Sequence, residues 1–202
     1  MRTSGLVLLL LAGCSSCATL PDGQPARAAM AAQVVQIVCG EGWGTGTAVA
    51  PGFVLTAKHV VEGCEEAGFD LQVIWTHSER DVAVIGWATN GPLVDPPMRA
   101  PILGENITCI GYPARPGDNR TTLTVTTGVV ASIEGTKMRV TCPIYYGNSG
   151  GPVYGDDGYQ IGVVVSMLAF LGLPYDGWYY AESWPYGLYE STPAVTESHS
   201  QE

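Results

Sequence analysis

A glycine-rich loop surrounds one serine in the second half of the chain. The segment YYGNSGGPVYG (residues 145–155) places Gly147, Gly150 and Gly151 around Ser149. Glycine costs conformational entropy when it is ordered, so this density indicates a sharp bend or a close approach of the backbone. A serine hydroxyl becomes an effective nucleophile only beside a base, an acid that orients the base, and donors for the oxyanion. Ser149 is therefore a candidate nucleophile that needs partners from elsewhere in the chain.

The sequence contains only three histidines that could serve as the base: His59, His77 and His199. His59 directly follows the apolar run GFVLTA, at a junction between strand and loop where a side chain can face a cleft. Asp81 begins another apolar run, DVAVIGW, where a carboxylate can be partly buried and can orient a histidine. We expect His77 near the surface and His199 solvated in a polar tail, so His59 is the better candidate.

Short runs rich in Val, Ile and Thr connect these residues, and Gly, Pro, Asn and Asp separate the runs. This texture is typical of an all-β sandwich or barrel. No amphipathic helical period of three turns stands out. Hydrophobic residues make up 46% of the chain and charged residues 14%, which supports a packed core. The proline-rich segment GPLVDPPMRAP is a plausible connector between two halves.

Three blocks in order, LTAKHV, DVAV and GNSGGPV, resemble the catalytic blocks of the trypsin-like (chymotrypsin-fold) serine proteases. The bacterial branch that is HtrA-like and glutamyl-endopeptidase-like is the most similar. The segments GWGTGTAVAPGFVLTAKHV, CIGYP and TTGVVASI extend the resemblance from about Val34 to Ser166. The resemblance implies two six-stranded antiparallel Greek-key barrels, over about 33–97 and 98–182, with the active site in the cleft between them.

The resemblance also implies a role for each candidate residue. His59 would be the general base, Asp81 its orienting carboxylate and Ser149 the nucleophile of a serine endopeptidase that forms an acyl-enzyme. The backbone N–H groups of Gly147 and Ser149 would form the oxyanion hole. Asn148 stands where the commonest family motif has Asp, which implies that activation by a freed N-terminus is absent. No cofactor and no metal are expected.

The specificity pocket of this family has its floor near the position six residues before the serine. Pro143 takes that place here, and no carboxylate stands beside it to receive Lys or Arg. We therefore predict an apolar or small residue before the scissile bond. The segment GVVVSML resembles the strand whose backbone pairs with substrate. The predicted substrate-binding residues are Pro143, Ile144, Tyr145, Ser166, Met167 and Leu168.

Six cysteines occur in the sequence, without the paired C-x-x-C motifs of a zinc site. The resemblance implies a disulfide between Cys39 and Cys64, which flank the His59 segment. Pairing of Cys109 with Cys142 depends on strand order and stays open at this point.

The N-terminus has the features of a secretory signal, with Arg2, a short apolar run and small residues before Cys14. The segment LAGC resembles the lipobox of bacterial lipoproteins, in which the cysteine carries lipid such as palmitate; an ordinary signal peptide is the alternative. We expect removal of residues 1–13, lipidation of Cys14, a tether over 14–32 and a flexible tail over 183–202. The predicted location is a bacterial cell-envelope membrane, with the periplasmic face of an outer membrane as one option.

The formal net charge of -10 argues against a nucleic-acid partner. The resemblance to the serine proteases implies a protein or peptide substrate. Two alternatives remain to be weighed. The loop GNSGG also satisfies the G-x-S-x-G elbow of α/β-hydrolases, but their order of serine, acid and histidine would require His199 in the tail. The chain could instead be an inactive or latent protease relative that acts as a binding module in the envelope. The oligomeric state is not predicted.

Overall fold

The computed structural model describes residues 24–40, 42–62, 64, 72–86, 97–114, 122–170 and 173–183. Within these ranges, the side chains of residues 24–26 and 166–178 are not described. The predicted lipidation site Cys14 and the histidine His199 lie outside the described residues. No helix among the described residues is long and apolar enough to cross a membrane.

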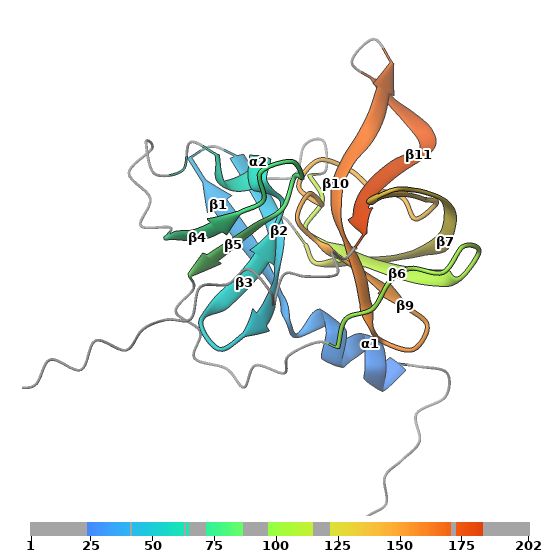
Figure 1. The fold of residues 1–202 in the computed structure, drawn as a ribbon, viewed down its shortest axis with the longest axis horizontal. Coiled ribbons are helices and arrows are strands. Elements are labelled where there is room, and N and C mark those ends of the chain that lie inside the picture. Colours follow the sequence, from blue (N-terminus) through green and yellow to red (C-terminus); the bar gives the residue numbers. More distant parts are fainter. Residues whose placement is uncertain are drawn as a thin grey trace, which may run out of the picture.

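The first half of the chain forms an antiparallel sheet whose strand order is β1-β2-β3-β5-β4 (Figure 1). Alternating small, branched and aliphatic side chains favour these strands, and their inner face buries Ile37, Val54 and Ile85 completely. Five strands form this sheet within the described ranges, where the resemblance implies six; residues 87–96 lie outside them. The elements are β1 (Val34–Cys39), β2 (Gly42–Ala50), β3 (Phe53–Thr56), α2 (Lys58–Val61), β4 (Val73–Thr76) and β5 (Ala83–Gly86).

The second half closes into a six-stranded antiparallel barrel with the order β10-β11-β8-β7-β6-β9. Its interior buries Ile107, Met138, Val153 and Ile161, each at most 1% exposed. The prediction of an all-β protein with two antiparallel units is confirmed, and the two units lie side by side in Figure 1. The strands are β6 (Asn106–Gly111), β7 (Thr124–Glu134), β8 (Lys137–Val140), β9 (Pro152–Gly155), β10 (Gln160–Phe170) and β11 (Leu173–Ser183).

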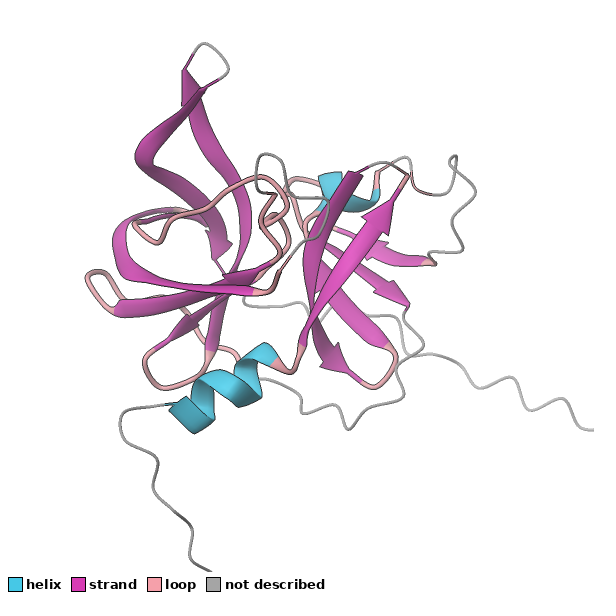
Figure 2. Cartoon of the chain, turned by 180° about the vertical axis from the view of Figure 1, so that it is seen from behind, coloured by secondary structure: helices cyan, strands magenta, loops and turns pink. Residues whose placement is uncertain are grey.

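A helix, α1 (Gln24–Ala31), precedes the first strand and lies beneath the second barrel (Figure 2). Its sequence QPARAAMA is rich in alanine, the strongest helix former. Met30 is buried in a cluster with Val34, Ile110 and Tyr154, so the helix joins the two units at their base. The segment predicted as a tether over 14–32 therefore contains helix α1, and the buried Met30 makes residues 24–31 part of the packed structure.

Two disulfides join described residues, one in each unit. Cys39 at the end of β1 is joined to Cys64, which follows α2, with their Cα atoms 5.2 Å apart. This is the pair that the resemblance implies. Cys109 of β6 is joined to Cys142, which follows β8, with a Cα–Cα distance of 6.4 Å. Each disulfide closes a loop and so lowers the conformational entropy of the unfolded chain, which stabilises the fold by roughly 3 kcal/mol.

Candidate active site

Strand pairing brings His59 and Asp81 together. Strands β3 and β5 are antiparallel, and Thr56 at the end of β3 pairs with Ala83 at the start of β5. The short helix α2 carries His59 three residues after Thr56, and Asp81 stands two residues before Ala83. Because antiparallel pairing juxtaposes the end of one strand with the start of the other, both side chains lie at the same edge of the sheet.

The imidazole of His59 and the carboxylate of Asp81 are hydrogen-bonded at two points. His59 Nδ1 lies 2.5 Å from Asp81 Oδ2, and the backbone N–H of His59 donates to Asp81 Oδ1 at 2.9 Å. A carboxylate can only accept in this pair, so Nδ1 carries the proton and Nε2 keeps its lone pair when the ring is neutral. Asp81 thus fixes both the orientation and the tautomer that a general base requires.

The pair shifts the pKa values of its two members in opposite directions. The hydrogen bond to Asp81 raises the pKa of His59 above its usual 6.5, although burial opposes the change. For Asp81, burial alone would raise the pKa, but the hydrogen bonds from the His59 ring and backbone outweigh it and the net pKa is lowered. Asp81 is therefore ionised at neutral pH and favours the protonated form of His59.

The glycines around Ser149 are required by the shape of the loop. Gly147 and Gly150 have φ angles of +88° and +85°, in the left-handed region that side chains disfavour. A Cβ at Gly147 would collide with the carbonyl of Tyr112 and the ring of Trp43. A Cβ at Gly150 would collide with the carbonyl of Thr45 and the hydroxyl of Thr56. The loop therefore needs glycine both for its bends and for its close contact with the first sheet.

Backbone hydrogen bonds orient the N–H groups of Gly147 and Ser149. The carbonyl of Tyr146 accepts from the N–H of Ala114 at 2.6 Å, and the carbonyl of Asn148 accepts from the N–H of Gly151 at 2.9 Å. In a trans peptide unit the C=O and the N–H point in opposite directions. The N–H groups of Gly147 and Ser149 therefore point away from these partners. Within the described part of the chain, neither donates to a protein acceptor.

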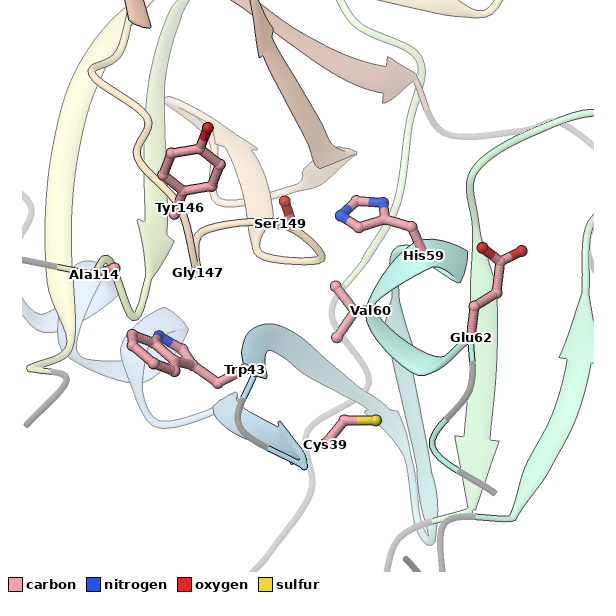
Figure 3. A pocket seen from close by; sticks show the side chains of 10 residues that line it. Cys39, Trp43, His59, Val60, Glu62, Ala114, Tyr146, Gly147 and Ser149 are labelled. Carbon is pink, nitrogen blue, oxygen red and sulfur yellow. The ribbon is translucent and has the colours of Figure 1, made fainter. Parts of the chain in front are cut away.

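Ser149 and His59 both line a pocket of about 400 Å³, and the His59 ring points toward Ser149 (Figure 3). The Trp43 and Tyr146 side chains stand near Gly147 at the other end of this pocket. Sequence reasoning singled out neither aromatic residue as part of the site, although GWGTGT was part of the family resemblance. The residues that line the pocket are Cys39, Gly42, Trp43, His59, Val60, Glu62, Ala114, Tyr146, Gly147 and Ser149.

Three of the residues predicted to bind substrate, Pro143, Ile144 and Tyr145, are described, and they are not among the described residues that line this pocket. Ile144 is buried at 3% exposure in the core of the second barrel, whereas Tyr145 is 48% exposed. Pro143 is exposed, and its carbonyl accepts from the hydroxyl of Thr126 at 3.3 Å. Their role in binding the substrate side chain stays a prediction.

The segment Ser166–Leu168 lies in β10. Ser166 and Met167 pair with Tyr180 and Tyr179 of β11 on one edge of the strand. On the other edge, β9 pairs only as far as Val163. Beyond Val164, no described strand pairs with this second edge. An open strand edge of this kind can accept an extended peptide.

The residue before Asp81 ties the acid-bearing segment to the second barrel. Arg80 forms an ion pair with Glu182 of β11 at 3.8 Å, and both side chains are at most 10% exposed. Arg80 also donates to the carbonyl of Ser183 at 3.5 Å. His77 has a local role, because its Nδ1 accepts from the N–H groups of Glu79 and Arg80. No cluster of three potential metal ligands occurs among the described residues.

The fold and this site agree with a match to the family described as trypsin-like peptidase domain, over residues 44–163. The match covers more than half of the chain. The chain belongs to the trypsin-like peptidase domain family.

Three known proteins are similar to this chain. The human peroxisomal leader peptide-processing protease is 29% identical over 176 residues, which are 73% of this chain and 30% of that protein. The serine endoprotease from Yersinia pestis is 25% identical with a TM-score of 0.64, covering 80% of this chain and 62% of that one. An inactive mutant form of Rv3671c from M. tuberculosis H37Rv shares the fold at 22% identity, with a TM-score of 0.62 over 79% and 84% of the two chains. The chain therefore spans less than two thirds of the first two relatives.

Proposed function

We propose that this trypsin-like domain is a serine endopeptidase that cleaves peptide bonds through an acyl-enzyme on Ser149. One observation carries the proposal: His59, hydrogen-bonded to Asp81, points its ring toward Ser149 in a pocket that both residues line. The N–H groups of Gly147 and Ser149, which have no protein acceptor within the described residues, complete the set of groups that acyl transfer needs.

The proposed reaction begins when His59 Nε2 takes the proton of the Ser149 hydroxyl as Oγ attacks the substrate carbonyl carbon. The carbonyl π electrons move to oxygen, and the N–H groups of Gly147 and Ser149 stabilise that oxyanion. Asp81 stabilises the imidazolium that forms. His59 then gives the proton to the leaving nitrogen as the C–N bond breaks. Water repeats the sequence on the ester, which releases the acid and regenerates Ser149.

For the substrate, we propose an extended peptide segment with an apolar or small residue before the scissile bond. The open edge of β10 beyond Val164 supports pairing with an extended backbone through the segment Ser166–Leu168. No acidic side chain occurs over residues 143–145, where a basic substrate residue would need one. A relationship to the HtrA-like branch is part of this proposal and rests on the sequence blocks alone.

We further propose that Cys14 is lipidated and anchors the protein to a bacterial envelope membrane. The LAGC segment after the apolar run supports this. Metabolic labelling with an alkyne fatty acid tests it. We expect label on the wild-type protein and none on Cys14→Ala. Label that persists on the variant would contradict lipidation at this residue.

Hydrolysis of an unfolded protein tests the activity and the preference together. Purified mature protein is incubated with β-casein, and the new termini are mapped by mass spectrometry. We expect cleavage mainly after Val, Ala, Leu or Ile, and none by Ser149→Ala. Cleavage after Lys or Glu would overturn only the preference. Binding of casein without cleavage by the folded wild-type protein would support the alternative, a latent or inactive binding module.

A further inference from the structure

One fully buried side chain contacts the serine loop without lining the pocket. Thr45 of β2 is 0% exposed, and all of its polar groups are used. Its hydroxyl donates to the carbonyl of Gly147 at 2.7 Å and accepts from the N–H of Tyr112 at 3.0 Å. Its own N–H donates to the carbonyl of Ser149 at 2.8 Å. Its carbonyl accepts from the hydroxyl of Thr56 at 2.7 Å.

The direction of these hydrogen bonds is unambiguous. A carbonyl oxygen can only accept and a backbone N–H can only donate, so the hydroxyl of Thr45 must give its proton to Gly147 and receive that of Tyr112. The partners lie 102 and 67 residues away along the chain. Thr45 therefore joins the first sheet to two segments of the second half.

The Gly147 carbonyl has a special place in the loop. It belongs to the peptide unit between Gly147 and Asn148. The proposed oxyanion donors belong to the two units on either side, which carry the N–H groups of Gly147 and Ser149. A change of ψ at Gly147 or of φ at Asn148 that the other angle does not compensate turns one of these donors relative to the other. A hydrogen bond that holds this unit therefore holds the two donors in register.

We propose that Thr45 is a positioning residue for catalysis, whose hydroxyl keeps the N–H groups of Gly147 and Ser149 converged on the oxyanion. This rests on the proposed peptidase function. The same residue is linked to the base, because Thr56, which donates to the Thr45 carbonyl, stands three residues before His59. Thr45 therefore holds the serine loop in a fixed position relative to the segment that carries His59.

The strand supplies a matched control two residues further on. Thr47 is also 0% exposed and lies in β2, but its hydroxyl has no hydrogen-bond partner among the described residues. Replacement of either threonine by valine removes one hydroxyl and keeps the branched shape. Only the change at Thr45 removes a hydrogen bond to the serine loop.

Steady-state kinetics on one peptide substrate compare wild type, Thr45→Val, Thr45→Ser and Thr47→Val. Because a misplaced oxyanion donor acts on the transition state, we expect Thr45→Val to lower kcat about 10- to 100-fold and to leave KM within about 3-fold. The serine variant keeps the donor and should retain kcat within about 3-fold of wild type, as should Thr47→Val. Across the series, the affinity for a peptide boronate, which mimics the tetrahedral intermediate, should weaken in parallel with kcat/KM.

Circular dichroism and active-site titration count the folded, competent molecules in each preparation. If Thr45→Val does not fold, Thr45→Ala and Thr45→Ser replace the comparison, because they differ by a single oxygen atom. Equal kcat per folded molecule in the variants with and without the hydroxyl would overturn the positioning role while leaving the peptidase function intact. A folded wild-type protein without any hydrolysis would overturn the proposed function, and the positioning role with it.

Discussion

The two sides of the cleft hold their functional groups by different forces. On the first sheet, His59 and Asp81 are held by a charge-assisted pair whose side chains remain 43% and 33% exposed. On the second barrel, the Ser149 loop is held by backbone hydrogen bonds to Thr45 and Val164, and the flanking Gly150 and Gly151 are buried. The histidine side should therefore respond to charge and pH, and the serine side to backbone conformation and packing.

The largest effect on activity is expected at Asp81. Asp81→Asn keeps the shape but its amide can donate to Nδ1, which favours the wrong tautomer of His59. We expect kcat to fall by about 10⁴-fold while the protein stays folded. Initial rates with a fixed peptide, beside thermal unfolding, measure this. The control is Asp156→Asn on an exposed turn, which should leave kcat within about 2-fold. Similar kcat values for the two variants would show that Asp81 does not orient the base.

A backbone change tests the serine side. Gly150→Ala adds a Cβ at φ +85° against the Thr45 carbonyl and the Thr56 hydroxyl. We expect the free energy of unfolding to fall by at least about 2 kcal/mol, from the left-handed backbone and the overlap together.

The matched control for this change is Gly104→Ala. Its φ is +81°, but a Cβ there meets nothing within 4 Å. The free energy of unfolding of this variant should fall only by the cost of a left-handed backbone at alanine, about 1 kcal/mol. Urea unfolding measures both variants, and losses of equal size would refute the view that close packing fixes the serine loop.

The pH dependence of kcat/KM distinguishes the histidine side of the cleft from the serine side, through a smaller effect than the substitutions above. Because His59 must be neutral to act as base, kcat/KM should rise with pH through an apparent pKa above about 6.5, since Asp81 raises the pKa of His59. Thr45→Val should lower the plateau without moving this midpoint. Asp81→Asn should move the midpoint of its residual activity downward. A midpoint that shifts in Thr45→Val would show that the two sides are not independent.

The smallest expected effect is the contribution of the His59–Asp81 pair to the free energy of unfolding. Because the pKa of His59 is raised in the folded state, the pair stabilises the fold fully at pH values below the unfolded-state pKa. This stabilisation is lost as the pH rises through the folded-state pKa. Because the pKa of Asp81 is lowered in the folded state, its contribution to stability is complete at pH values above the unfolded-state pKa. This contribution is lost as the pH falls through the folded-state pKa. The stability difference between wild type and His59→Gln should therefore be largest between about pH 4 and 6.5. Urea unfolding at several pH values checks this, and a difference that grows above that window would contradict it.

The sequence was most informative where residue types are scarce or strongly patterned. The all-β fold follows from short β-branched runs, and His59 was singled out among three histidines because it directly follows such a run. The structure places it with Asp81 in a hydrogen-bonded pair. Before the fold the sequence predicts a tether with at most one helical turn, whereas the structure has the eight-residue helix α1, because a short alanine-rich segment becomes ordered when Met30 packs against the base of the barrel. The pairing of Cys109 with Cys142 depends on strand order, which local pattern does not reveal.

The hydrogen bonds that hold the serine loop could not be predicted from the sequence either. Thr45 lies in a run where threonine is an ordinary strand residue, and Thr47 in the same run looks identical by pattern. What separates them is contact with Tyr112 and Gly147, which lie far along the chain. Trp43 was missed as a wall of the pocket for the same reason.

Labelling with a fluorophosphonate, read by intact mass, tests the central claim most directly. The reagent forms a stable adduct only with a serine that is activated by a base and an oxyanion hole. We expect one adduct on the mature wild-type protein, none on Ser149→Ala, and strongly slowed labelling of His59→Ala. Absence of an adduct on folded wild-type protein, or an adduct that persists in Ser149→Ala, would contradict the account.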